Sequence, residues 1–439
     1  MQDLRKSILR AWVCLAFLPI QLYAQGNENS WEKFVATYCE GYQALELPPL
    51  RIAYVDNLNG IKDEQELLEQ QSFFDTSQKN LGAFSIHTLA PKQQLEYELM
   101  HYQVKLNKAR IAVEQKWLER GSKSFSREGL SQLDMGKELY RYYLKRWIDL
   151  SVEPDSMFEF GLKEIHRVKG KMKLLQQKSG MDSVAFGEYV GTKAFFWENP
   201  DDVQAAFEAY DQQLRESLGK YFPELDRIPP HLIQRGTDKR LAQVPGFYRN
   251  NTFFYNIFDA PFNKRQIAWL YLHEAVPGHH YQRSYNALLQ LSPLQPLINL
   301  LGFSEGWAAY IEDVGLEIGL YPNESDELGK WEWDIIRSVR VSLDVALNYY
   351  NWTDERALEF WKKHISNLDN IGLREIARMK RWPAQVITYK YGANKILHWK
   401  HMLEREEGFD LKVFHEEVLR RGPLPYSILE KYILNQSQN

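Results

Sequence analysis

Apolar residues recur at three- and four-residue spacing along most of the chain, which is the pattern of amphipathic helices. The spacing is clear over 91–119, 154–177 and 199–222, and each stretch has a proline at or near its first helical position. Further helices are predicted around 324–350, 354–368, 392–406 and 410–420. The chain is therefore predicted to be mainly helical.

One segment departs from this pattern. Residues 241–258 are rich in aromatic and β-branched side chains and are punctuated by Pro, Gly and Asn, which predicts one or two short strands. They are followed by a helix predicted to begin at Asn263 and to contain His273 and Glu274. An extended peptide could pair with the edge of a strand in this place. The predicted fold is a large helical domain with a small β element beside this helix.

The beginning of the chain has a different composition from the rest. Three basic residues precede an apolar run over 11–24, and a polar stretch follows. The run is too short to cross a bilayer, so we interpret 1–24 as a secretory signal peptide, with an uncleaved anchor or a buried helix as the alternative. The rest divides into an N-terminal helical segment over 25–90, with no sharp boundary, and a main helical domain over 91–439. The protein is predicted to be periplasmic or extracellular.

Composition and charge limit the kinds of molecule that the protein is expected to bind. The 439 residues are 44% hydrophobic and 26% charged, which is typical of a globular protein with a large core. The net charge is -4 and no basic tract occurs, so nucleic acid is not an expected partner. No segment after the signal is long and apolar enough to span a membrane. Cys14 and Cys39 are the two cysteines; only Cys39 would remain after cleavage, so the core must provide stability without an intrachain disulfide. Nothing in the sequence indicates an oligomeric state.

The segment HEAVPGHH contains the candidate chemistry. In the common HExxH arrangement, two His residues one helical turn apart bind zinc, and the Glu beside the first acts as general base on water. Here His273 and Glu274 match the first two positions, but Pro277 occupies the fifth. The next candidates for a second ligand are His279 and His280. Three of the 11 histidines thus lie within eight positions, which favours a metal site over surface histidines.

A straight helix would keep these histidines apart. Six or seven residues correspond to roughly 9–10.5 Å of helical rise, whereas two imidazoles on one zinc each lie about 2 Å from it. Pro277 removes a helical N–H and crowds the preceding turn, and Gly278 permits backbone angles that other residues avoid. We therefore predict a break between the ligands. His279 is preferred as the second ligand because its gap is smaller, and His280 remains the alternative.

The segments HEAVPGHHYQ (273–282) and EGWAAYIE (305–312), together with three later motifs, resemble those of the bacterial domain-of-unknown-function-885 (DUF885) family, distant relatives of gluzincin-type zinc peptidases whose third ligand is Glu. The matching motifs occur in the family's order and cover about 90–435 of the chain. The resemblance implies a helical hydrolase with one zinc ion and a peptide substrate. It makes Glu305 the third ligand and leaves a fourth position for water. The motifs are HEAVPGHHYQ (273–282), EGWAAYIE (305–312), RSVRVSLD (337–344), PAQVITYKYG (383–392) and FHEEVLRRGPLP (414–425), with a weaker match at GKELYRYYL (136–144).

The resemblance also indicates supporting residues. Glu312 lies on the same predicted helical face as Glu305 and is a candidate for orienting a ligand, with a solvated surface glutamate as the alternative. Tyr389 is a candidate donor to the oxyanion of the tetrahedral intermediate, with an ordinary core tyrosine as the alternative. Arg340 and Asp344 either bind a substrate terminus or form a structural pair at four-residue spacing, and for Asp344 we favour the structural role.

One position departs from the family pattern. Where the resemblance leads us to expect His four residues after Asp344, the chain has Asn348, which can donate a hydrogen bond but cannot carry charge. Asn348 is kept as a candidate substrate-binding residue, and its presence puts full activity in question. The predicted function is an exported zinc peptidase with Glu274 as general base. The alternatives are a weak or inactive metal-containing binding protein and a zinc amidase acting on a non-peptide or cell-wall amide.

Overall fold

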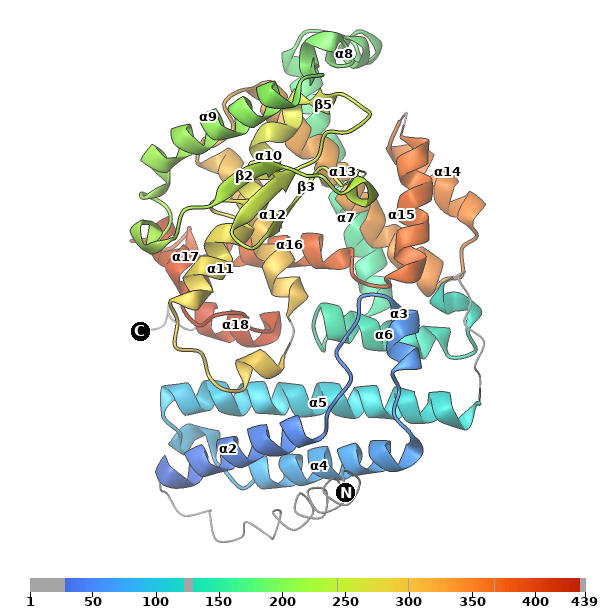
Figure 1. The fold of residues 1–439 in the computed structure, drawn as a ribbon, viewed down its shortest axis with the longest axis vertical. Helices are drawn as coiled ribbons and strands as arrows, with labels where there is room; N and C mark the ends of the chain where they lie inside the picture. Colours follow the sequence, from blue (N-terminus) through green and yellow to red (C-terminus); the bar gives the residue numbers. More distant parts are fainter. Residues whose placement is uncertain (1–27, 122–128, 243, 299, 367, 435–439) are drawn as a thin grey trace.

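The computed structural model describes residues 28–121, 129–242, 244–298, 300–366 and 368–434. The fold is mainly helical with two small sheets, as predicted (Figure 1). The helices are α2 (Glu28–Ala44), α3 (Tyr54–Asn59), α4 (Glu64–Leu81), α5 (Pro91–Glu119), α6 (Gly136–Trp147), α7 (Pro154–Lys178), α8 (Ser183–Val190), α9 (Pro200–Leu218), α10 (Ile267–Glu274), α11 (His279–Ala287), α12 (Leu301–Glu317), α13 (Glu324–Asn348), α14 (Asp354–His364), α15 (Asp369–Arg381), α16 (Ile387–Leu403), α17 (Leu411–Leu419) and α18 (Tyr426–Leu434). The signal peptide predicted for 1–24 lies outside the described residues. Within the described ranges, every helix is too short or too polar to span a lipid bilayer.

Helices α2, α4 and α5 form a layer at one end of the molecule (Figure 1). Aromatic side chains hold it together: the Tyr38 and Phe73 rings lie 5.4 Å apart, and both are buried. The Trp31 indole N–H donates to Glu96 on α5 at 2.8 Å, so the polar groups of this interface are also paired. The helical character predicted for 25–90 is thus observed from residue 28 onward, whereas a domain boundary at 90 stays a prediction.

A three-stranded sheet packs beside α10, where the sequence predicted a small β element. It consists of β2 (Leu232–Arg235), β4 (Thr252–Tyr255) and β3 (Gly246–Arg249) in that order, with β2–β4 parallel and β3–β4 antiparallel. Strand β3 contacts α10. A second pair joins β1 (Phe196–Trp197) to β5 (Phe262–Asn263). The parallel partner β2 was not predicted, because its sequence, LIQR, lacks the aromatic residues that marked 241–258.

Two glycines from different motifs allow α12 and α16 to cross closely. A Cβ atom on Gly306 would lie 2.6 Å from the Cα of Gly392, and a Cβ on Gly392 would lie 2.5 Å from the Cα of Gly306. Side chains at these positions would push the helices apart. Glu305 therefore sits where α12 approaches α16, the helix that contains Tyr389.

Buried ion pairs connect α7, α12, α13 and α16. Lys390 Nζ lies 2.8 Å from Glu164 and 2.7 Å from Asp334, and Lys330 Nζ contacts both Asp334 at 2.8 Å and Asp313. All five side chains are buried. Because each charge has an opposite partner, the cost of removing it from water is offset. The network holds the helices that surround the centre of the domain.

The side chain of His415 should make the stability of the fold depend on pH. The ring is fully buried, Nδ1 donates to the Tyr221 carbonyl at 2.6 Å, and Nε2 accepts from the Tyr310 hydroxyl at 2.7 Å. Burial lowers the pKa of His415 to about 3. Below the unfolded pKa of about 6.5 the unfolded chain takes up a proton that the folded ring refuses. The stability contribution is therefore complete above about pH 6.5 and falls as the pH drops toward 3.

We expect the wild type to lose about 2 kcal/mol more unfolding free energy between pH 7 and pH 5 than His415→Gln does. Glutamine can retain one donor and one acceptor but does not titrate. Urea unfolding of both proteins at the two pH values measures the difference. Equal losses would show that His415 takes up its proton in the folded state.

Candidate metal centre

The helix that begins after β5 is interrupted between the predicted ligands. Helix α10 ends at Glu274, and α11 begins at His279, with Ala275 and Gly278 outside helical geometry. The Pro277 carbonyl accepts a hydrogen bond from the Trp307 indole at 2.9 Å, which ties the break to α12. The break predicted at Pro-Gly is therefore confirmed.

Gly278 is required by the close contact of its backbone with α10. A Cβ atom there would lie 2.0 Å from the carbonyl oxygen of His273 and 2.3 Å from that of Leu272. No side chain fits at such distances, so any larger residue would force α11 away from α10. Gly278 thus allows His279 to lie close to His273.

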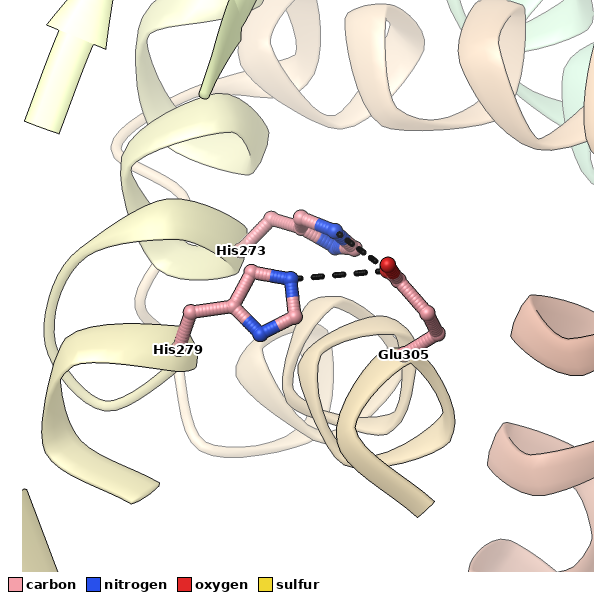
Figure 2. A group of neighbouring side chains, drawn as sticks. All are labelled: His273, His279 and Glu305. Atoms are coloured by element: carbon pink, nitrogen blue, oxygen red, sulfur yellow. Dashed lines mark ion pairs between the residues drawn. The ribbon is translucent and has the colours of Figure 1, made fainter. Parts of the chain in front are cut away.

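Three side chains from α10, α11 and α12 converge on one point (Figure 2). His273 Nε2 lies 3.6 Å and His279 Nε2 lies 3.4 Å from the same oxygen, Oε2 of Glu305. Their potential ligand atoms all lie within 4.8 Å of one another. The structure thus brings together His273, the preferred second histidine His279, and Glu305, which the family resemblance implied as third ligand.

These separations fit a tetrahedral ion. Ligand atoms about 2.0–2.1 Å from zinc stand about 3.3–3.4 Å apart at the corners of a tetrahedron. The two N–O distances of 3.4 and 3.6 Å lie near that value and are longer than normal hydrogen bonds. Two imidazoles and one carboxylate are also a donor set that zinc accepts with an open fourth position. The residues present therefore fit a divalent cation.

The Nδ1 atoms of His273 and His279 each contact a further side chain. His273 Nδ1 lies 2.7 Å from Glu312, which is fully buried and also paired with Arg337 at 2.6 Å. His279 Nδ1 lies 3.3 Å from the Ser304 hydroxyl. Such contacts fix the ring orientation and leave each Nε2 facing the centre.

The electrostatics of the site favour a positive charge at its centre. Burial lowers the pKa of His273, but the hydrogen bonds with Glu305 and Glu312 outweigh this effect and raise the pKa to about 9. Burial raises the pKa of Glu305, yet His273 and His279 bring the net pKa well below the usual range. Both shifts mean that two carboxylates stabilise cationic charge between them.

Replacing the buried carboxylate behind His273 should weaken metal binding. We expect Glu312→Gln to reduce zinc affinity by about 10–100-fold, because the ring loses its charged acceptor. Competition with a chromophoric zinc chelator measures the change. The variant also leaves Arg337 buried without its partner. Glu312→Gln/Arg337→Met removes that stranded charge and should regain stability but not affinity; full zinc affinity in the double variant would contradict the role.

Both predicted catalytic residues adjoin His273, Glu274 as the next residue in the chain and Tyr389 through its ring. Glu274 directly follows His273 at the end of α10 and is 9% exposed. The Tyr389 ring on α16 stacks on the His273 ring, with centroids 6.1 Å apart. Burial and the charge of Glu305 raise the pKa of Tyr389, so its hydroxyl stays protonated at neutral pH.

His280, the alternative second ligand, faces away from Glu305. Its Nε2 lies 2.8 Å from the Pro229 carbonyl, and its Nδ1 lies 3.0 Å from the Tyr248 hydroxyl on β3. Its ring also packs against His231, with centroids 4.9 Å apart. The structure therefore assembles the cluster with His279, and His280 connects α11 to the sheet.

Arg340, Asp344 and Asn348 lie on one buried stretch of α13. Arg340 pairs with Glu375 at 3.0 Å rather than with Asp344, which accepts from the Tyr140 hydroxyl and the Ala384 N–H at 2.7 and 2.8 Å. Asn348 hydrogen-bonds to the backbone of Leu130, Asp344 and Met379, at 3.0–3.2 Å. All three side chains thus have partners inside the fold, and substrate contact by Arg340 or Asn348 stays a prediction.

A second group of potential ligands lies on the surface. Glu317, His401 and Glu404 are all exposed, and Lys400 lies between the two carboxylates at 2.6 and 2.5 Å. Lys400 already offsets part of the negative charge that would attract a cation, and all three side chains are open to water. This group therefore serves best as a control for the buried cluster.

Sequence reasoning missed two arginines that act on the centre. Arg337 belongs to the RSVRVSLD motif, yet only the fold shows that it pairs with Glu312. Arg378 on α15 carries no motif signal that we recognised, and it lies close enough to Tyr389 and Glu305 that both raise its pKa against the lowering effect of burial. A charged residue at helical spacing looks the same whether it faces water or a buried partner.

The chain combines a broken helix that contains two candidate ligands with a third candidate ligand on α12, and a family model identifies the class. The model described as "Bacterial protein of unknown function (DUF885)" matches residues 71–433. The chain therefore belongs to the DUF885 family, as the motifs predicted. No curated protein matches it.

Solved structures show the same fold elsewhere. A candidate lipoprotein from Colwellia psychrerythraea is 20% identical with a TM-score of 0.66, over 94% of this chain and 77% of that one. A candidate lipoprotein of unknown function from Shewanella oneidensis is 15% identical with a TM-score of 0.60, over 96% of each chain. A looser match, with a TM-score of 0.43 and 12% identity over 94% of this chain and 96% of the other, is a carboxypeptidase from Pyrococcus furiosus.

Proposed function

We propose that this protein is a zinc-dependent peptidase that holds one zinc ion with His273, His279 and Glu305. The observation that supports this most is the convergence of two Nε2 atoms on one carboxylate oxygen at 3.4 and 3.6 Å, close to tetrahedral spacing. The adjacent position of Glu274 gives the site a base as well as a cation site.

Each group has a defined part in hydrolysis. Bound zinc supplies Lewis-acid polarisation of the scissile carbonyl and lowers the pKa of water. Glu274 removes a proton from the attacking water and later passes it to the leaving amine as the C–N bond breaks. Tyr389 donates a hydrogen bond to the oxygen on which negative charge develops. Edge strand β3, beside α10, offers backbone groups to an extended substrate.

We also propose that the protein acts outside the cytoplasm. The leader pattern over 1–24 is that of an exported protein. The two structurally similar proteins described as candidate lipoproteins support the same location. The expected substrates are therefore peptides of the periplasm or of the surroundings of the cell.

Metal removal and a broad substrate test examine the proposal together. We expect the purified protein to contain about one zinc per chain and to cleave members of a peptide library followed by mass spectrometry. A chelator should abolish cleavage, and added zinc should restore it. Zinc without cleavage of any amide would favour the metal-containing binding protein. Cleavage of muropeptides but not of ordinary peptides would favour the amidase.

A further inference from the structure

Three arginine side chains from α13 and α15 surround a single carboxylate. Glu375 lies 3.0 Å from Arg340, 3.4 Å from Arg378 and 3.5 Å from Arg374. One negative charge cannot neutralise three positive ones. The cluster of Arg340, Arg374, Arg378 and Glu375, hereafter the arginine cluster, thus carries an excess of positive charge.

A further acid, Asp344, feels the charges of Arg378 and Arg340 and offsets only part of this excess. Burial raises the pKa of Asp344 to about 7, even though Arg378 and Arg340 oppose the rise, so its carboxyl group compensates their charge only in part. Its Oδ1 is already occupied by Tyr140 and Ala384. Burial also lowers the pKa of Arg340, and the charge of Arg378 adds to that effect. An uncompensated positive field remains.

Two donors of the arginine cluster have no acceptor. The Nε–H groups of Arg340 and Arg378 are buried, and neither has a hydrogen-bonding partner among the described residues. Buried polar groups are normally paired, and these two Nε–H groups are exceptions, although both arginines pair with Glu375 and Arg378 Nη2 also donates to Gln385 at 2.9 Å. The Arg340 side chain is 2% exposed and that of Arg378 is 22% exposed. Part of the Arg378 side chain is therefore open to solvent, whereas Arg340 is enclosed.

The arginine cluster borders the candidate metal centre. The Arg340 guanidinium lies 5.6 Å from the centroid of the Tyr389 ring, and that ring stacks on His273. Arg378 interacts electrostatically with both Tyr389 and Glu305. If a substrate is bound at the candidate metal centre and extends past Tyr389, the part beyond Tyr389 would thus lie beside the positive charge of Arg378.

We propose that Arg378 binds the free terminal carboxylate of the peptide substrate, so that this site removes residues from the C-terminal end of peptides. The inference rests on the proposed peptidase function. A carboxylate matches the planar donor fork of a guanidinium, and its charge offsets the excess of the arginine cluster. Water adds to the last peptide carbonyl, the C–N bond breaks, and the released amino acid leaves with the transferred proton on its amine. A peptide N-terminus, which is cationic, would be repelled from this position.

Binding without turnover tests the inference. In the Glu274→Gln background, zinc-loaded protein is titrated calorimetrically with acetyl-Ala-Ala-X peptides, where X is Phe, Leu, Arg or Glu, each made as free acid and as amide. We expect the best acid to bind about ten-fold or more tightly than its amide, because the amide loses a charge-assisted pair. Adding Arg378→Gln should remove most of that preference, and Arg378→Lys should retain part of it.

Arg381→Gln is the matched control, because Arg381 lies on the same helix but is exposed. It removes the same charge and should leave the preference for acids unchanged. Equal binding of acids and amides, binding of neither, or a preference that survives Arg378→Gln would each overturn the inference. The wild type gives an independent measurement: cleavage of amidated peptides as fast as acids keeps the peptidase and rejects the carboxylate site. Selective binding of acids without any cleavage keeps the site and rejects the peptidase.

Discussion

Glu274→Gln is expected to retain its zinc and to lose about 10²–10⁴-fold in kcat, the range typical of a missing general base. Glutamine has nearly the shape of glutamate and leaves the three convergent side chains in place, but it cannot accept a proton at neutral pH. Glu274 is the last residue of α10, so its backbone position is fixed by the same helix that positions His273. Zinc content per chain and kcat on a peptide selected from the library measure the two halves of the prediction.

A second substitution separates proton transfer from folding. Glu274→Asp keeps the carboxylate but withdraws it by one methylene, so it should recover part of the activity that Glu274→Gln lacks, since efficiency depends on the reach of the base. Thermal unfolding of both variants should match the wild type. A zinc-loaded Glu274→Gln protein with more than about a tenth of the wild-type kcat would assign the base to another residue.

Local signals in the sequence were sufficient for most helices. Pro91, Pro154 and Pro200 stand at the first positions of α5, α7 and α9, and the Asn199 side chain accepts from the Asp201 N–H at 3.0 Å as a cap. The break between α10 and α11 was also a local matter, because proline and glycine change the backbone wherever they occur. These predictions needed no knowledge of what the helices contact.

Contacts between distant segments could not be derived in this way. Glu305 lies 32 positions after His273, and periodicity marks it no differently from other acidic residues, so only the resemblance to a family selected it. Whether a given arginine of α13 or α15 reaches Glu312, Glu375 or solvent depends on helix crossing angles. Those angles follow from packing such as the approach of Gly306 to Gly392, which hydrophobic spacing does not encode.

Asn348 shows how such a contact changes an interpretation. From sequence it is a missing histidine, and a loss of activity is the natural expectation. In the fold its amide bridges the backbone before α6, within α13 and at the end of α15, with all of these groups buried. The amide makes two donations and one acceptance here, whereas a single imidazole tautomer has one donor and one acceptor and could satisfy only two of these three bonds. The asparagine thus stabilises the helices that present Arg340 and Arg378.

Glu305→Ala is expected to lose more than about a hundred-fold in zinc affinity, beyond the range typical for residues that only support a ligand. His273 and His279 would remain, but two neutral donors lack the charge that partly neutralises a divalent ion. In the wild type, zinc should raise the melting temperature because it binds the folded chain. In Glu305→Ala the same addition should produce little change. Zinc titration followed by calorimetry and thermal unfolding measures both effects.

Glu317→Ala is the matched control for this prediction. It lies on the same helix, α12, and belongs to the exposed group with His401 and Glu404. Its carboxylate pairs with Lys400, so its removal should leave the zinc affinity and the zinc-dependent rise in melting temperature unchanged. The opposite pattern, in which Glu317→Ala loses zinc and Glu305→Ala keeps it, would move the ion to the surface. The break at Pro277 and Gly278 brings His279 close to His273. Metal binding would then no longer explain this arrangement.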